Sequence, residues 1–261
     1  MSLLVVGALH WDVVVRAPRL PELDETLHGQ EVAYQFGGKG GNQAIAAAKA
    51  GVPVNFAGRI GTDAAGASML KQLEMAGINV SQLQRGAGSS GMSVAITTEG
   101  GDYGAVIVSA ENHAFDMSEF KIPSDCSMVL LQNEMAPGAF AAFANAAIAT
   151  GAQIIWNAAP AKEIQMADLA LVDTLIVNRL EAADLIGHYD IGFSPAATLA
   201  KLADLAPDAE IILTMGGDGA AFSAPGEPCE VQKAHPVDVI STHGAGDIFV
   251  GTYAASRLRG L

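Results

Sequence analysis

The chain has 261 residues, half of them apolar and only 16% charged, so it can bury one large core and is not expected to be disordered. Its net charge of −14 argues against a nucleic acid as partner, because backbone phosphates would be repelled. The apolar runs are too short to cross a bilayer, no basic segment precedes the first of them, and the two cysteines stand far apart, so we expect a cytoplasmic protein without signal peptide or disulfide.

Short apolar runs alternate with Ala-rich stretches along the chain. The runs lack polar alternation, as expected for strands that are buried on both faces. This order predicts an α/β fold, a doubly wound and mostly parallel sheet flanked by helices. The expected strands are 3–6, 54–57, 128–131, 154–156, 175–177 and 211–213. The expected helices are 42–50, 64–76, 137–150, 195–205 and 248–257.

Two segments, 12–35 and 91–108, interrupt this alternation. They contain strand-like pieces with no helix between them, and the sequence Glu-Gly-Gly-Asp at 99–102 is typical of a hairpin turn. We expect the two segments to form a small antiparallel β lid over a ligand site. The main domain would then comprise residues 1–11, 36–90 and 109–261.

The sequence Gly244-Ala245-Gly246-Asp247 precedes the last expected helix. Two glycines allow a sharp turn, and amide hydrogens at a helix N-terminus attract anions. An Asp held there can accept a proton from a hydroxyl while the amides stabilise charge on a phosphoryl group. An ordinary glycine turn with a capping Asp is the alternative interpretation of these four residues.

A Gly-rich segment, 36–43, opens the first expected helix with the sequence Phe-Gly-Gly-Lys-Gly-Gly-Asn-Gln. Its glycines would let a ligand touch the backbone, and Asn42 can hydrogen-bond hydroxyl groups as donor and acceptor. It is not a Walker A loop, because Gly40 follows Lys39 where Ser or Thr is needed. A flexible loop is the alternative.

Asn178 and Glu181 follow an expected strand, at the end where α/β sheets place ligands. They could hold a hydrated Mg²⁺ ion and phosphates through water, because Mg²⁺ prefers oxygen ligands and keeps its waters. The alternative is a helix start with an acidic residue in its first turn. Glu134 and Asn157 also end strands, with similar alternatives.

Together these segments resemble the ribokinase-like carbohydrate kinases of the phosphofructokinase-B superfamily, in order and over nearly the whole chain. Residues 36–44 are very similar to the Gly-Gly-Lys-Gly-x-Asn-Gln-Ala segment of ribokinases, and residues 58–77 resemble the first family signature, in which Asp63 is expected to be structural. The other matching segments are 7–12, 157–161, 178–181, 214–216 and 244–247.

The resemblance implies ATP as the phosphoryl donor and Mg²⁺ as its companion ion. Asp247 would accept the proton of a sugar hydroxyl, and the amides of Gly244, Ala245 and Gly246 would stabilise the transferring phosphoryl group. Glu181 would hold Mg²⁺ through water. The residues implied to contact the sugar are His10, Asp12, Gly38, Lys39, Asn42 and Glu134. The residues implied to contact the nucleotide are Asn178, Thr214, Gly216 and Gly219.

Three features depart from the family pattern. His10 stands where ribokinases have Asn, so the exact sugar stays open. The residues Ser241, Thr242 and His243 replace an Asp-Thr-Thr sequence whose Asp contributes to a monovalent-cation site, so K⁺ at Ser241 and His243 is a weaker expectation than ATP and Mg²⁺. The chain ends at Leu261, where family members continue through helices near the adenine, so we expect either a piece of a longer protein or an open nucleotide site.

We therefore expect an ATP-dependent kinase for a small sugar, with a pentose such as ribose ahead of hexoses. Two alternatives stay open. One is a nucleoside kinase, whose larger ligand would need apolar or aromatic residues around its base, as Trp11, Phe36 and Phe115 could supply. The other is a non-catalytic sugar-binding homologue. The expected partners are the sugar and ATP, without nucleic acid or membrane, and a homodimer through the lid is compatible with the sequence.

Overall fold

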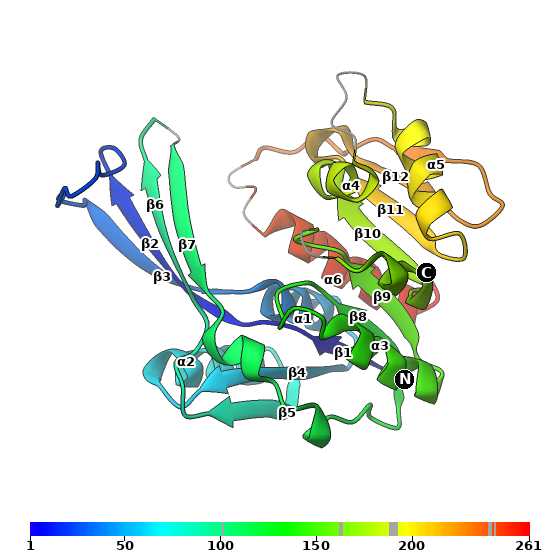
Figure 1. Ribbon diagram of the computed structural model, residues 1–261, viewed down its shortest axis with the longest axis horizontal. Helices are drawn as coiled ribbons and strands as arrows, with labels where there is room; N and C mark the ends of the chain where they lie inside the picture. Colours follow the sequence, from blue (N-terminus) through cyan, green and yellow to red (C-terminus); the bar gives the residue numbers. More distant parts are fainter. Residues whose placement is uncertain (101, 162–163, 188–192, 240–241, 243) are drawn as a thin grey trace.

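The computed structural model describes residues 1–100, 102–161, 164–187, 193–239, 242 and 244–261, so Ser241 and His243 lie outside the described residues. Within them, a nine-stranded sheet has the order β13-β12-β11-β10-β9-β8-β1-β4-β5 (Figure 1). The six pairings between neighbours from β11 across to β5 are parallel, and the pairings of β12 with β11 and with β13 are antiparallel. This confirms the mostly parallel sheet. The strands are β1 (Ser2–Val6), β4 (Val54–Gly61), β5 (Asn79–Gly86), β8 (Cys126–Leu131), β9 (Gln153–Asn157), β10 (Thr174–Asn178), β11 (Glu210–Thr214), β12 (Ala220–Ser223) and β13 (Glu230–Gln232).

Helices cover both faces of the sheet, because successive side chains of its central strands point to opposite sides. In β1, Leu3 and Val5 belong to the core cluster beneath one set of helices, and Leu4 and Val6 belong to the other cluster. The helices on the Leu3 side are α1 (Lys39–Lys49), α2 (Ala64–Met75) and α6 (Ala245–Leu258). The helices on the Leu4 side are α3 (Phe140–Thr150), α4 (Arg179–Ile186) and α5 (Pro195–Leu205). Short 3-10 turns lie at Ala110–Ala114, Met117–Glu119, Met166–Leu171 and Gly216–Asp218.

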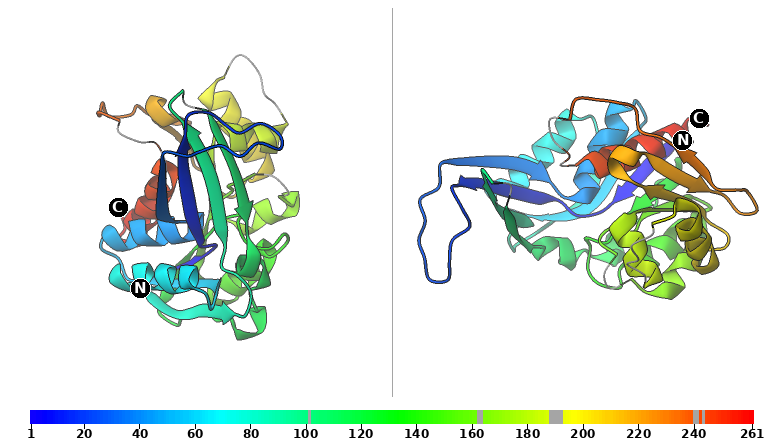
Figure 2. Two further views of the ribbon diagram at one scale, coloured as in Figure 1. Left: turned by 90° about the vertical axis from the view of Figure 1, so that its left-hand side faces the viewer. Right: turned by 90° about the horizontal axis from the view of Figure 1, so that it is seen from above.

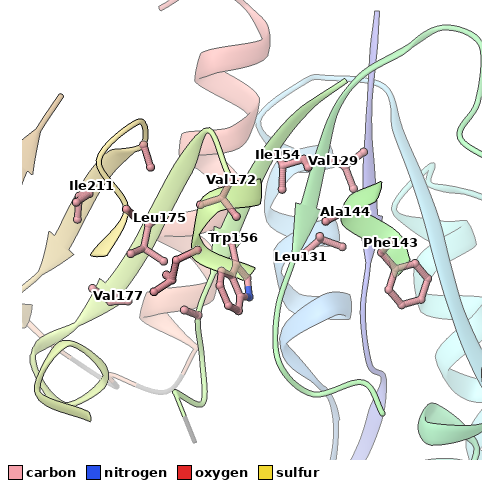
Figure 3. Close-up of a cluster of buried hydrophobic side chains, with 14 of the residues drawn as sticks. Val129, Leu131, Phe143, Ala144, Ile154, Trp156, Val172, Leu175, Val177 and Ile211 are labelled. Carbon is pink, nitrogen blue, oxygen red and sulfur yellow. The ribbon is translucent and has the colours of Figure 1, made fainter. Parts of the chain in front are cut away.

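The Leu4 side of the core is filled by aliphatic strand residues and an aromatic group from α3 (Figure 3). Trp156 is 1% exposed and stacks on Phe140, with ring centroids 4.0 Å apart. Burying such side chains stabilises a fold by roughly 1.5–3 kcal/mol each. This packing fixes β8, β9 and β10 against one another, and these strands carry polar residues at their carboxyl ends.

A second sheet of four strands stands off the main one as a ribbon (Figures 1 and 2). Its order is β3-β2-β6-β7, with antiparallel outer pairs and a parallel central pair, β2 with β6. The central pair is parallel because both strands leave the main sheet from the same edge, β2 after β1 and β6 after β5. These strands are β2 (His10–Ala17), β3 (Glu31–Gly37), β6 (Met92–Thr98) and β7 (Tyr103–Val108).

Two helices begin three residues earlier than their sequences predict. α1 starts at Lys39 and α6 at Ala245, so the glycine-rich segments form first turns and not loops before the helices. β5 escaped prediction because it is an edge strand with half-exposed polar residues and no apolar run. In the described part of the chain, the helices are too short and too polar to span a bilayer.

Candidate active site

The candidate site lies where the parallel strands of the main sheet end. Parallel strands end at one edge of their sheet, so the residues that follow them are brought close together. Glu134 follows β8, Asn157 ends β9 and Asn178 ends β10. Asn178 is also the register partner of Thr214 in β11. The structure therefore brings together residues that lie up to 80 positions apart in the sequence (Glu134 to Thr214).

Asp247 lies in the first turn of α6 and is 8% exposed. Gly244 precedes this helix with a φ of 72°, a left-handed conformation that favours glycine. The Asp247 Oδ1 atom accepts a hydrogen bond of 2.9 Å from the Gln43 side-chain amide, and Oδ2 accepts one of 3.1 Å from the Asn42 side-chain amide. Both carboxylate oxygens are thus held by α1, beside the exposed start of α6.

Close packing of α1 and α6 makes these contacts possible. A Cβ added at Gly251 of α6 would lie 2.3 Å from the Gln43 carbonyl oxygen and 2.8 Å from the Ala46 Cβ atom. Both approaches are shorter than real side chains allow, so only glycine permits this spacing. The sequence signal for this site is therefore a glycine four residues after the predicted base, which sequence reasoning did not identify.

Glu134 and Lys39 face each other at the start of α1. The backbone N–H of Lys39 donates a hydrogen bond of 2.7 Å to the Glu134 Oε2 atom. Burial raises the pKa of Glu134 to about 7, the Lys39 ammonium opposes this rise, and the nearby Asp247 and Asp12 carboxylates add to it. Three carboxyl groups and one ammonium group are therefore close enough to influence one another.

His10 and Asp12 occupy the root of the lid. The His10 Nδ1 atom is 3.9 Å from the Glu134 Oε2 atom, and burial lowers the pKa of His10, which favours the neutral imidazole. Among the described residues, the buried Nε2 atom of His10 has no hydrogen-bond partner. The Asp12 Oδ1 atom accepts a hydrogen bond of 2.5 Å from the Ser93 hydroxyl group, which ties β2 to β6.

Gly38 forms the turn between β3 and α1 with a φ of 87°. A Cβ at this position would lie 2.6 Å from the Ala8 carbonyl oxygen and 2.8 Å from the His10 backbone nitrogen. The backbone here approaches the loop after β1 too closely for any other residue. Gly38 therefore sets the distance between the loop carrying His10 and the helix carrying Asn42.

Asn178 and Glu181 form a reciprocal pair at the start of α4. The Asn178 Oδ1 atom accepts a 2.9 Å hydrogen bond from the Glu181 backbone N–H, and the Glu181 Oε2 atom accepts a 2.8 Å bond from the Asn178 backbone N–H. This capping box is the local reason why the helix begins here. Burial raises the pKa of Glu181. The predicted alternative, a helix start with an acidic first turn, is thus present in the structure.

The predicted nucleotide residues of the next loop lie beside this helix start. Arg179 of α4 forms an ion pair with Asp218, with 2.5 Å between the Nη2 and Oδ2 atoms, and so ties the two loops together. Gly216 and Gly219 have positive φ values, 61° and 99°. A Cβ at Gly219 would lie 2.0 Å from the Gln232 carbonyl oxygen, which explains its glycine.

The structure also answers two smaller expectations from the sequence. Asp63 is structural, because its carboxylate caps α2 through the Gly66 N–H and accepts hydrogen bonds from Ser90. The expected monovalent-cation residues Ser241 and His243 lie outside the described residues. Two buried residues of the site, Gln43 and Gln132, were not identified as candidates, because their partners are 89 to 204 positions away in the sequence.

The model of the pfkB family of carbohydrate kinases matches residues 1–261, the whole chain. A ribokinase from Haemophilus influenzae is 30% identical over 267 residues, covering 98% of this chain and 85% of that protein. A ribokinase from Schizosaccharomyces pombe is 28% identical over 277 residues, covering 100% and 86%. The structure of Arabidopsis thaliana ribokinase complexed with ribose and ATP has a TM-score of 0.88 at 27% identity, covering 99% and 86%. The chain belongs to the pfkB family of carbohydrate kinases, phosphotransferases that act on a sugar hydroxyl.

Proposed function

We propose that this chain transfers the γ-phosphate of ATP to a hydroxyl of a pentose such as ribose, with Asp247 as the general base. The observation that carries the proposal is the position of Asp247, buried in the first turn of α6 with Asn42 and Gln43 holding its two oxygens. Each carboxylate oxygen keeps a further lone pair for a substrate hydroxyl. The likeness to ribokinases supports the choice of a pentose.

The amides of Gly244, Ala245 and Gly246 would stabilise the transferring phosphoryl group. Ala245 and Gly246 are exposed at the start of α6, where the helix dipole favours negative charge. The Ala245 N–H donates a 3.2 Å hydrogen bond to the Thr242 carbonyl oxygen and would exchange it for a phosphoryl oxygen. The Lys39 ammonium, close to Glu134, would add a positive charge. Catalysis of phosphoryl transfer depends mainly on such positioning and electrostatic stabilisation.

Mg²⁺ and the nucleotide would bind at the edge of the sheet where Asn178 ends β10 and Thr214 ends β11. One oxygen of Glu181 accepts the hydrogen bond of the capping box, and the other oxygen can bind a water of a hydrated Mg²⁺ ion. When bound, Mg²⁺ would neutralise charge on the phosphates. Thr214, Gly216 and Gly219 would contact the nucleotide. The loop turns at Gly216 and Gly219, where φ is positive.

The sugar would lie between the root of the lid and α1. Asp12, Glu134 and Asn42 offer acceptors and donors for its hydroxyl groups, and the Gly38 backbone would contact it at the turn into α1. His10 would contact a sugar hydroxyl through its Nε2 atom, which has no partner among the residues that the structure describes. An imidazole differs in shape from the carboxamide of ribokinases, so His10 would tune which sugar is preferred.

A coupled assay of ADP release across pentoses, hexoses and nucleosides tests this proposal. We expect ribose or another pentose to raise ADP release well above the rate without acceptor, and to do so only with Mg²⁺. Comparing K⁺ with Na⁺ buffers tests cation activation in the same assay. A preference for nucleosides would favour the nucleoside kinase alternative. No increase with any alcohol would contradict the kinase function and favour a non-catalytic sugar-binding protein.

We further propose that two copies of the chain associate through their lids in the cytoplasm. One face of the lid carries an apolar row in which Tyr34, Val13, Val94 and Val106 are cross-strand neighbours, on the opposite face from Asp12. Tyr34 is 62% exposed and Val106 is 67% exposed. Contiguous exposed apolar residues of this kind mark interaction sites. The two free cysteines fit a reducing compartment.

A further inference from the structure

Three side-chain carboxamides form a buried chain that ends on Asp247. The Gln132 Nε2 atom donates a 2.7 Å hydrogen bond to Gln43 Oε1, and Gln43 Nε2 donates 2.9 Å hydrogen bonds to both Asn157 Oδ1 and Asp247 Oδ1. Gln43 is 0% exposed, Gln132 is 4% exposed and Asn157 is 7% exposed. Water is therefore largely excluded from these three side chains, and the hydrogen bonds among them are stronger than they would be in solution.

The main chain fixes the direction of these hydrogen bonds. The Asn157 Nδ2 atom donates a 3.1 Å hydrogen bond to the Ile176 carbonyl oxygen, which can only accept. Asn157 must therefore turn its own oxygen toward Gln43. Gln43 in turn must present its NH₂ group to Asn157 and Asp247, and its oxygen to Gln132.

Both hydrogens of the Gln43 amide are used in this arrangement, one for Asn157 and one for Asp247. A carboxamide nitrogen offers no acceptor, so Gln43 cannot take the substrate proton in place of Asp247. Together with the Asn42 donor on Oδ2, the Gln43 donor on Oδ1 fixes the plane of the carboxylate. Rotation of that plane would turn the free lone pairs away from a hydroxyl group.

The far end of the chain supports a functional role. The buried Oε1 atom of Gln132 has no hydrogen-bond partner among the described residues. A buried acceptor without a partner is destabilising, and in native structures such groups call for an explanation. Gln132 Oε1 is the end atom of this series of hydrogen bonds. The Ile176 carbonyl oxygen sets the donor-to-acceptor direction of the series, and that direction presents a donor to Asp247.

We propose that Gln43 is a positioning residue that orients the Asp247 carboxylate, with its own orientation set by Asn157 and Gln132. This role rests on the proposed function of Asp247 as general base. Gln132 follows β8, Asn157 ends β9 and Ile176 lies in β10, so the central sheet determines how the base of α6 is oriented. Gln43 itself contacts Asp247 and, because it is fully buried, offers no surface to a substrate.

The test is a double-substitution cycle on the full chain, measured as single-turnover phosphoryl transfer to ribose. Gln43→Met keeps the length of the side chain and removes the donor. We expect it to lower the rate constant by roughly 10- to 100-fold, the effect typical of a misplaced catalytic group, and to change KM for ribose and ATP by less than about threefold. In the Asp247→Ala background, the same substitution should lower the residual rate by less than about twofold.

The control variant is Ile45→Val, in the same helix and partly buried against the core, which should leave the rate unchanged. If Gln43→Met does not fold, Gln43→Glu keeps the shape of the side chain and places an oxygen against Asp247, and it should lower the rate at least as much. Equal losses in the wild-type and Asp247→Ala backgrounds would overturn the positioning role alone. A wild-type chain that phosphorylates no acceptor would overturn the proposed function and, with it, this role.

Discussion

Two carboxyl groups at the start of α1 lie in different environments. Asp247 accepts two hydrogen bonds from side-chain amides, whereas Glu134 accepts one from the Lys39 backbone N–H. Burial raises the pKa of Glu134 to about 7, so near neutral pH it exists both as acid and as carboxylate. It can therefore donate to or accept from a sugar hydroxyl group.

Replacing Glu134 with Gln should stabilise the folded chain in a pH-dependent way. Because the pKa of Glu134 is raised from 4.5 in the unfolded chain to about 7, the folded chain binds its proton more tightly. The contribution of Glu134 to the free energy of unfolding is therefore most favourable at low pH, and it declines as the pH rises from about 4.5 through 7. Glu134→Gln should raise the free energy of unfolding by roughly 1–3 kcal/mol at pH 8 and by much less at pH 5.

Denaturant unfolding at the two pH values measures this difference. Glu74→Gln on the exposed surface of α2 is the matched control and should change the free energy of unfolding little at either pH. If Glu134→Gln is no more stable than the wild type at pH 8, the buried carboxyl group is not a source of instability.

Sequence motifs supplied the candidate site residues, which stay predictions, but not the contacts that the structure shows among them. Asn42 was expected to bind the sugar, and the structure adds its hydrogen bond to Asp247. Gln43 stands beside Asn42, yet nothing local marks it, because Gln132 and Asn157 are 89 and 114 positions away. Only the order of β8, β9 and β10 in the sheet brings these side chains together.

At the scale of the elements, Asn178 at the start of α4 has two roles, as a helix cap and as a proposed nucleotide contact. Asn178→Ala should destabilise the fold by about 1 kcal/mol, because the capping box is lost. If Asn178 also contacts the nucleotide, the same substitution should raise KM for MgATP severalfold. Ser194 caps α5 by accepting a single hydrogen bond from the Ala197 N–H, without a capping box, and provides the control.

Ser194→Ala should lower the thermal midpoint by a similar amount and leave KM for MgATP unchanged. Thermal unfolding and initial-rate kinetics on both variants separate the two roles. Equal KM values for MgATP in the two variants would reduce Asn178 to a helix cap and contradict its assignment to the nucleotide.

Element boundaries were predictable where a stop signal is local and less so where glycine is part of the helix. α3 ends at Thr150, before Gly151, whose φ is 75°, as the sequence predicts. The starts of α1 and α6 were placed three residues too late, because glycines weaken a helix in isolation. Packing of α1 on α6 compensates here, since Gly251 allows the two helices to approach closely.

At the scale of the whole molecule, the lid could be predicted as a sheet but not in its pairing. The hairpin of β6 and β7 is local, whereas β2 and β6 pair in parallel across about 80 residues, for example Val13 with Val94. β2 and β6 pair in parallel because β1 and β5, which precede them, end at the same edge of the main sheet. No local sequence pattern encodes that arrangement. The lid projects from one side of the body (Figure 2). Three side chains of its apolar row, Tyr34, Val94 and Val106, are exposed.

Val106→Lys should convert a lid-paired dimer into a monomer, because it places a charge in the apolar row beside Val94. Sedimentation velocity at micromolar concentration measures the change. Ile107→Lys is the matched control, since Ile107 lies on the opposite face of the same strand and is 58% exposed. A monomeric wild-type chain, or equal dissociation of both variants, would contradict pairing through this row.

The central claim is that Asp247 is the base of a sugar kinase, and the most direct measurement is kcat for ribose phosphorylation by the wild type and Asp247→Ala. Removal of a general base lowers the rate by about 10²- to 10⁴-fold. We expect kcat to fall by at least about 10²-fold while the thermal midpoint shows that the variant is folded. A folded Asp247→Ala variant with full kcat would contradict the account.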